Sequence, residues 1–219
     1  MISPETFTRQ HRMLGRNAAF TVFFLLIAYA VTLVLGILSL KSPQDPIGDP
    51  YFSVLELLIV VIAPLIVIVM TAVHAYASPE TKAYSLTALA FMVIMAGITC
   101  SVHFVILTVS RQIEAAGFPW ASILFSFKWP SVAYTLDILA WDFFFALSML
   151  FAAPVFRIGR LEKTIGTLMI VSGVLSLAGL IGVPLADMNI RNIGIVGYVG
   201  VSLLVFLLLG ILFGRTPRI

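Results

Sequence analysis

The sequence predicts an all-α, polytopic membrane protein: a six-transmembrane-helix bundle with an interfacial or re-entrant segment between helices 3 and 4. Composition is the first observation behind this prediction, because 61% of the 219 residues are apolar and only 11% are charged. A soluble domain usually carries roughly 25% charged residues. Six long apolar runs and an uneven distribution of Lys and Arg are the other two observations. So little polar surface excludes a soluble enzyme, a soluble nucleic-acid binder and a disordered protein.

The six apolar runs define the predicted architecture. A helix needs about 20 apolar residues to cross the hydrocarbon of a bilayer. The runs do not alternate as the strands of a membrane barrel would, so we expect one transmembrane domain over residues 18–213. A cytoplasmic amphipathic segment, 1–17, precedes it with a helix start at Ser3–Glu5, and a cytoplasmic tail, 214–219, follows it. The spans are expected near residues 18–40, 51–76, 84–109, 132–154, 165–186 and 194–213.

The basic residues predict the orientation of the chain. An even number of spans places both termini on one side, and cytoplasmic loops carry an excess of Lys and Arg. With the termini inside, the cytoplasmic side holds Arg9, Arg12, Arg16, Lys82, Arg157, Arg160, Lys163, Arg215 and Arg218, and the outer side holds Lys41, Arg111, Lys128 and Arg191. We therefore expect a multi-pass protein of the cell (inner or plasma) membrane, with cytoplasmic termini and the lipid bilayer as its partner. No basic stripe indicates a nucleic-acid partner.

The connection between the third and fourth spans, residues 110–131, is half apolar and rich in aromatic residues. They are Phe118, Trp120, Phe125, Phe127 and Trp129. Tryptophan is enriched at the membrane–water interface. The segment is therefore expected either to anchor the chain at headgroup level or to fold over the outer mouth of the bundle as a lid.

Small residues are frequent in the last two spans. They are Gly166, Ser172, Gly173, Ser176, Ala178, Gly179 and Gly182 in the fifth span, and Gly194, Gly197 and Gly200 in the sixth. Small residues let helix backbones approach closely in lipid. We expect helices 5 and 6 to pack together; the alternative is that they form a homo-oligomer interface or bind a membrane partner.

Four ionisable residues fall inside the predicted spans: Glu56, His103, Asp137 and Asp142. A charge at the bilayer centre costs at least about 2.5–3.5 kcal/mol, so such residues indicate function by default. From a rise of about 1.5 Å per residue, the first three lie about 8–9 Å below the outer end of their helices, and Asp142 lies about 15 Å deep. His74 lies at the inner end of its span, too far from His103 for the two to share a haem.

Helical phase predicts the neighbours of the two aspartates. Asp137 shares a face with Tyr134 and Trp141, which are three and four residues away. At about 100° per residue, Asp142 points about 140° away from Asp137. We therefore expect that the two aspartates do not form a paired-carboxylate site.

Helical phase also predicts a partner for Asp142. His103 shares a face with Thr99 and Cys100, and it is the nearest cationic group by depth. An unpaired ionised carboxylate near the midplane is costly, so we expect Asp142 to face the bundle interior and to reach His103 directly or through water. A protonated Asp142 that bonds the hydroxyl of Thr99 or Ser101 is the alternative.

Each of these residues also has a simpler interpretation. Ser53 and Glu56 fit a capping box, although Asp49 is a competing cap that would place Glu56 inside the helix. His103 can serve as a hydrogen-bonding group between helices. Asp137 can interact favourably with the positive, N-terminal end of its helix dipole.

Three functional hypotheses follow. The first is an outward-facing intramembrane pocket that binds or transports a small cation, a proton or an amphipathic molecule. The second is an accessory or scaffold subunit, and the third is a membrane-embedded enzyme acting on a lipid-like substrate, with His103 as acid or base. No sequence motif identifies catalytic residues or a cofactor. The pocket residues would be Glu56, His103, Asp137, Asp142, Tyr134, Trp141 and Thr99; the side chains that could contribute to a metal site are Glu56, His103, Asp137 and Cys100.

Overall fold

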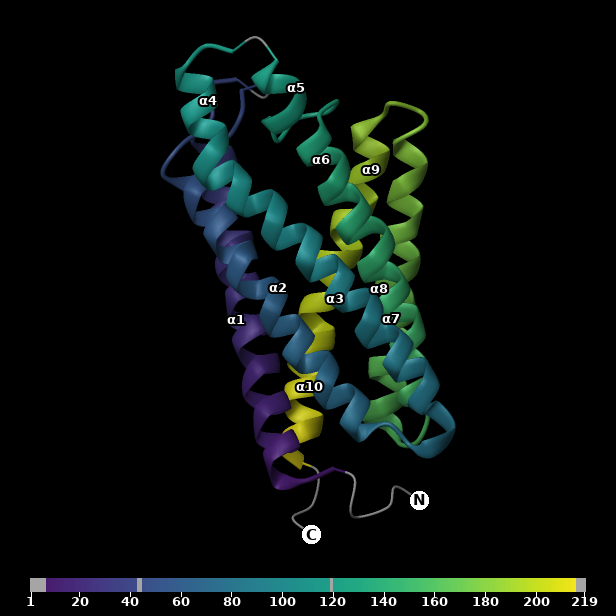
Figure 1. Cartoon of the computed structure of the whole chain (residues 1–219). Helices are drawn as coiled ribbons and strands as arrows, with labels where there is room; N and C mark the ends of the chain where they lie inside the picture. Colours follow the sequence, from purple (N-terminus) through teal and green to yellow (C-terminus); the bar gives the residue numbers. More distant parts are fainter. Residues whose placement is uncertain (1–6, 43–44, 119, 216–219) are drawn as a thin grey trace.

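The computed structural model describes residues 7–42, 45–118 and 120–215. Within these ranges the chain forms helices and turns and no strand, and six helices are long and apolar enough to cross a membrane. The predicted all-α six-helix bundle is therefore confirmed. Figure 1 shows the long helices running side by side, with both termini at one end and α4, α5 and α9 at the other.

The N-terminal half contains the first three spans. The first helix is α1, Arg9–Leu38, and the second is α2, Tyr51–Tyr76. The third span is continuous from Pro79 to Ile113 and consists of η1 (Pro79–Thr81), α3 (Lys82–Val105), the π-helical η2 (Ile106–Ser110) and α4 (Arg111–Ala115).

The first helix begins earlier than the apolar run predicts. Thr8 caps α1, because its hydroxyl accepts a hydrogen bond from the amide of His11 while the His11 side chain accepts one from the amide of Thr8. Residues 9–17 are therefore the first turns of the spanning helix rather than a separate surface helix. The predicted helix start at Ser3–Glu5 lies outside the described residues.

The C-terminal half contains the other three spans. The short helix α5, Ala121–Phe125, precedes the fourth span, which consists of α6 (Val132–Ile138), the π-helical η3 (Leu139–Phe145), α7 (Ala146–Ala152) and η4 (Ala153–Val155). The fifth span is α8 (Arg160–Gly179) with η5 (Leu180–Gly182). The sixth span consists of α9 (Met188–Ile195), the π-helical η6 (Val196–Val201) and α10 (Ser202–Arg215).

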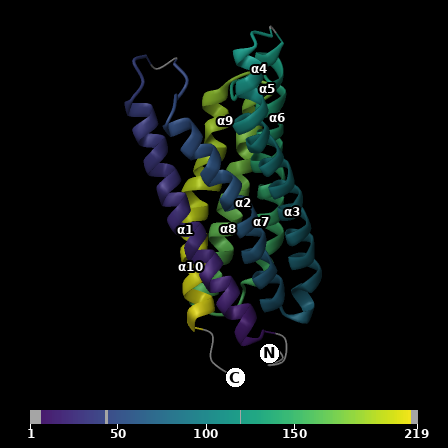
Figure 2. The same ribbon diagram turned by 60° about the vertical axis from the view of Figure 1, so that its left-hand side comes forward.

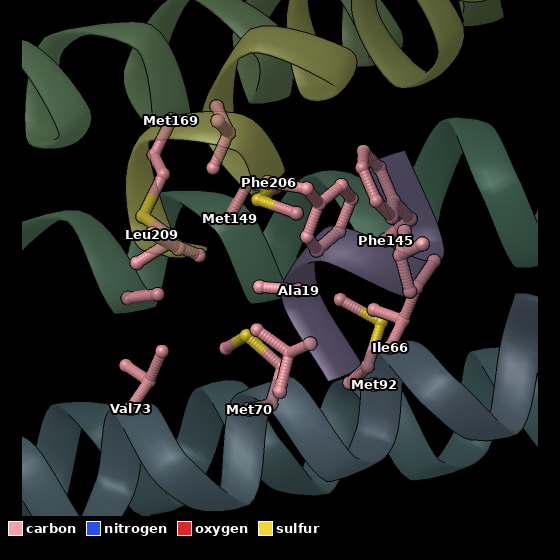
Figure 3. Close-up of a cluster of buried hydrophobic side chains, with 14 of the residues drawn as sticks. Ala19, Ile66, Met70, Val73, Met92, Phe145, Met149, Met169, Phe206 and Leu209 are labelled. Carbon is pink, nitrogen blue, oxygen red and sulfur yellow. The ribbon is translucent and has the colours of Figure 1, made fainter. Parts of the chain in front are cut away.

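The helices pack around an apolar core in the middle of the bundle. Helix α1 contacts α2 and α10, α2 contacts α3, and α3 contacts η3 and α7, while α8 contacts α7, α9 and α10 (Figure 2). Every span contributes to the buried cluster in Figure 3, which includes Ala19, Ile66, Met70, Val73, Met92, Phe145, Met149, Met169, Phe206 and Leu209. All ten of these side chains are apolar.

Spans five and six pack closely through their small residues, as predicted. The Ser172 hydroxyl donates to the carbonyl of Gly197 at 2.8 Å, and Gly166 and Gly173 lie against the backbone of the fourth span. Gly200 is different, because a methyl group added there would meet only Val196 at 3.9 Å. Apart from Gly200, these glycines are thus covered by other parts of the chain.

Candidate functional site: a buried ionic network

Five ionisable side chains from five segments meet in the half of the bundle that lies away from the termini. They are Glu56 on α2, His103 on α3, Asp137 on α6, Asp142 on η3 and Arg191 on α9, and we call them the ionic network. Their exposed fractions range from 0% for Asp142 to 5% for Asp137. Charged side chains are almost never buried to this extent unless they are paired.

His103 bridges two carboxylates. Its Nδ1 lies 2.6 Å from Oε2 of Glu56, and its Nε2 lies 3.2 Å from Oδ1 of Asp137. Ionised carboxylates only accept hydrogen bonds, whereas both nitrogens of an imidazolium donate. Both hydrogen bonds can form to ionised carboxylates only if both nitrogens of His103 carry a proton. His103 is then an imidazolium, with one proton more than the neutral ring. With that proton, Glu56, His103 and Asp137 together still carry one negative charge.

Arg191 joins the two aspartates of the fourth span. Its Nη2 lies 3.3 Å from Oδ2 of Asp142 and 3.6 Å from Oδ2 of Asp137. The guanidinium carbon lies 5.2 Å from the ring centre of Tyr134 and 5.7 Å from that of Tyr198. Both distances are within the range of cation–π attraction. Arg191 is thus held by two carboxylates and two aromatic rings.

The prediction that Asp137 and Asp142 point apart was wrong, and the π-helical segment η3 is the reason. Its hydrogen bonds run from residue i to i+5, so residues five apart lie nearly one above the other. Asp142 lies within η3, five residues after Asp137, and both carboxylates approach the same atom of Arg191. A π-helical turn that re-aims a side chain is frequent at functional sites.

Arg191 is the member of the ionic network that the sequence did not predict. The predicted sixth span began at residue 194, which left Arg191 in an outer loop. In the structure α9 begins at Met188, because the Asp187 carboxylate caps it by accepting hydrogen bonds from the amides of Asn189 and Ile190. An Asp followed by an apolar periodic stretch is a helix-start signal, so Asp187 could have revealed the earlier start.

The predicted direct pair between Asp142 and His103 is not formed either. Asp142 faces the bundle interior, as expected, but its ion-pair partner is Arg191. His103 instead uses both of its nitrogens on Glu56 and Asp137. Asp142 and His103 are linked only indirectly, through Asp137 and Arg191.

The carboxylate of Asp142 rests against the backbone of two glycines. A methyl group added at Gly194 would overlap Oδ1 of Asp142, and one added at Gly179 would lie 2.7 Å from the same atom. Neither oxygen of Asp142 forms a hydrogen bond with the described residues, and Nε and Nη2 of Arg191 form none either. Such unsatisfied buried groups require an explanation such as a functional role or a bound water or ion.

The capping hypothesis for Glu56 was also wrong. Ser53 does not cap α2 with Glu56; Oδ1 of Asp49 instead accepts hydrogen bonds from the amide and the hydroxyl of Ser53. Glu56 therefore lies inside the helix and is free to bond His103.

The other predicted pocket residues divide into two groups. Tyr134 contacts Arg191, and Trp141 is buried with its ring 5.4 Å from that of Tyr198, so both line the network. Thr99 instead donates to Sδ of Met95. His74 bonds Ser85 near the opposite end of the bundle.

The residues suggested for a metal site do not converge on one point. Within the described ranges, no three His, Cys, Asp or Glu side chains are placed so that they could hold a metal ion. Cys100 points instead at the carbonyl of Val60, with its Sγ 3.7 Å away. Both ring nitrogens of His103 are already bonded to carboxylates.

The segment between the third and fourth spans covers the network. The Phe127 ring lies 5.4 Å from that of His103 and meets Tyr134 edge to face at 5.2 Å. Trp120 and Phe118 are exposed on the outside of the segment and stack on each other. The network is thus enclosed rather than open.

Two cavities, of about 600 and 320 Å³, lie instead at the end that carries the termini, lined by residues that include Arg160 and Arg9.

A second, exposed polar cluster lies at the surface beyond Glu56. Arg111 donates to Oδ1 of Asp49 at 3.1 Å and to the hydroxyl of Ser53 at 2.6 Å. Ser53 and Glu56 are three residues apart on α2, so they share a face. The seam between α2 and the third span therefore carries one ionic pair at the surface and another, Glu56 with His103, inside.

This surface cluster leads to a prediction about pH. The hydroxyl of Ser53, its amide and the charge of Arg111 lower the pKa of Asp49 below its ordinary value of 3.8. A carboxyl whose pKa is lowered by folding stabilises the protein above its unfolded pKa, and this contribution disappears as pH falls through the folded pKa. We expect the contribution of the cluster to decline as pH falls past the ordinary value of 3.8. Unfolding midpoints measured from pH 6 to about 3 should differ between wild type and Asp49→Asn, and the difference should shrink toward the acid end. A constant difference would contradict this.

Comparisons of the chain with protein-family models, with curated proteins and with solved structures found no match.

Proposed function

We propose that the protein binds one small cation, a proton or a monovalent metal ion, at the ionic network and carries it across the membrane. The observation that supports this proposal is the charge balance of the network. Three carboxylates face one arginine and one histidine. Even with His103 protonated, the network holds one negative charge in excess.

An uncompensated charge is costly in a buried site. Transfer of an ionised carboxylate into an apolar environment is so unfavourable that the group normally becomes neutral or acquires a partner. Uptake of one positive charge brings the network to neutrality. Intramembrane carboxylates and histidines with this arrangement mark ion pathways and proton relays in membrane proteins.

Asp142→Asn provides the direct test, because it removes the excess charge with little change in shape. The network then needs no further cation, so the variant should fold and fail to transport. We would reconstitute both proteins in liposomes and measure charge movement after jumps of pH, Na⁺ and K⁺. Wild type should move charge, and Asp142→Asn should not.

Asp49→Asn is the matched control, since it makes the same chemical change in the exposed cluster. It should keep the wild-type current. Charge movement by Asp142→Asn equal to that of wild type would refute the proposed function.

A further inference from the structure

We propose that the ion bound by the network is the proton, that its final site is Asp142, and that it arrives through His103 from the end of the bundle that carries α4 and α5. This inference rests on the proposed function and specifies its substrate. Three observations support it: the tight packing around Asp142, the two-sided bonding of His103, and the surface cluster beyond Glu56.

The packing around Asp142 favours a proton over a larger cation. Its Oδ1 lies against the backbone at Gly194 and Gly179, so closely that neither position could carry a methyl group without contact. A metal ion such as Na⁺ needs several oxygen ligands around it, as the hard cations do. A proton needs no such space, and it converts a carboxylate that forms no hydrogen bond with the described residues into a neutral acid.

The bonding of His103 suits proton transfer. One nitrogen faces Glu56 and the other faces Asp137. The ring can therefore release a proton to Asp137 and accept another from Glu56. In the proposed step, a proton reaches Glu56, and the imidazolium gives its Nε2 proton to Asp137. A half-turn of the imidazole then lets the Glu56 proton restore the imidazolium.

Asp137 passes the proton on to Asp142. Both carboxylates lie against Nη2 of Arg191, because η3 places them on one face. The transfer leaves Asp137 ionised beside His103 and Arg191. Asp142 becomes neutral, packed against Gly194 and Gly179. The network as a whole then carries no net charge.

The groups that face these two side chains are the other members of the ionic network, together with aromatic rings. His103 faces Glu56 from α2, Asp137 from α6 and the ring of Phe127. Asp142 faces Arg191 from α9 and Asp137. Three tyrosines from three segments complete the electrostatic surroundings of the network: Tyr29, Tyr134 and Tyr198.

The entry side follows from the seam between α2 and the third span. Asp49, Ser53 and Arg111 form a hydrogen-bonded cluster at the surface, one helical turn from Glu56. On the opposite side of the network, in the middle of the bundle, the cluster that includes Ala19 and Leu209 is apolar (Figure 3). The polar path from solution to the network therefore lies on the α4–α5 side, beneath Phe127.

The test uses the intact protein in liposomes that contain a trapped pH-sensitive dye. The buffer contains no metal cation: N-methylglucamine is the bulk cation, and thiocyanate is the permeant counter-ion. Wild type should dissipate an imposed pH gradient under these conditions, at a rate that added Na⁺ or K⁺ does not change and that falls in D₂O. His103→Gln should slow the flux by about a hundredfold, the usual cost of losing a positioned acid–base group. His74→Gln, outside the network, should not.

The outcomes separate this inference from the proposed function. Transport of Na⁺ or K⁺ without dissipation of the pH gradient would refute the proton inference and leave the proposed function standing. Absence of any cation flux would refute both. A wild-type rate in His103→Gln would refute the route through His103. Because the first two outcomes depend on wild type alone, a poorly folding variant does not prevent a decision.

Discussion

Replacing Arg191 with glutamine is expected to lower the free energy of unfolding by about 3–5 kcal/mol, the usual cost of breaking a buried ion pair by removing one partner. Arg191 is the only cation within ion-pair distance of Asp142 among the described residues. Without it, two negative charges remain uncompensated in the network. Equilibrium unfolding in mixed detergent micelles would measure the loss.

A double variant identifies the cause of this destabilisation. Arg191→Gln combined with Asp142→Asn removes one charge of each sign and returns the network to its original excess, so it should be clearly more stable than Arg191→Gln alone. Arg111→Gln is the surface control. Its pair with Asp49 is 41% and 54% exposed, and exposed pairs contribute about 0–1 kcal/mol. Equal losses for Arg111→Gln and Arg191→Gln would contradict the account of the network.

Gly194→Ala is the second substitution with a large expected effect. The added methyl group would overlap Oδ1 of Asp142, and the carbonyl of Ser176 lies 3.5 Å from the same point. The carboxylate must move away from α9, so we expect a loss of about 1–3 kcal/mol, typical of overpacking, together with loss of cation transport. Unfolding and liposome flux would be measured on the same preparation.

Gly200→Ala is the matched control in the same span. The added methyl group would meet only Val196, and alanine is about 0.5–1 kcal/mol more favourable than glycine within a helix. It should therefore be neutral or slightly stabilising. In an Asp142→Ala background, Gly194→Ala should lose most of its cost, because the overlapping atom is gone. An unchanged cost in that background would show that the overlap with Asp142 is not the cause.

Hydropathy alone was sufficient to predict the fold and the meeting of three of the five network residues. The apolar runs are long and separated by turn-forming residues, so the six spans follow from the length that a bilayer requires. Glu56, His103 and Asp137 lie at similar predicted depths on three helices, and their side chains do meet. Depth is predictable because the rise of a helix is nearly constant.

The placement of the other two network residues, Asp142 and Arg191, depends on features that hydropathy does not record. Arg191 follows a polar stretch, so a window average assigns it to a loop, although the Asp187 cap already starts the helix there. The π-helical turn in η3 changes the direction of Asp142 relative to Asp137. A constant 100° per residue therefore gives the wrong face.

The order of charges along the chain has a consequence for biosynthesis. In three of the four ion pairs of the network the acid comes first: Glu56 precedes His103, and both Asp137 and Asp142 precede Arg191. Since the chain is made from its N-terminus, the acids enter the bilayer before the helices that neutralise them, at a cost of about 2.5–3.5 kcal/mol for a centrally placed Asp. The sixth span, which is synthesised last, carries the guanidinium of Arg191 that completes the network. A nascent chain that ends before Met188 should therefore stay associated with the insertion machinery, and its release should coincide with the arrival of Arg191.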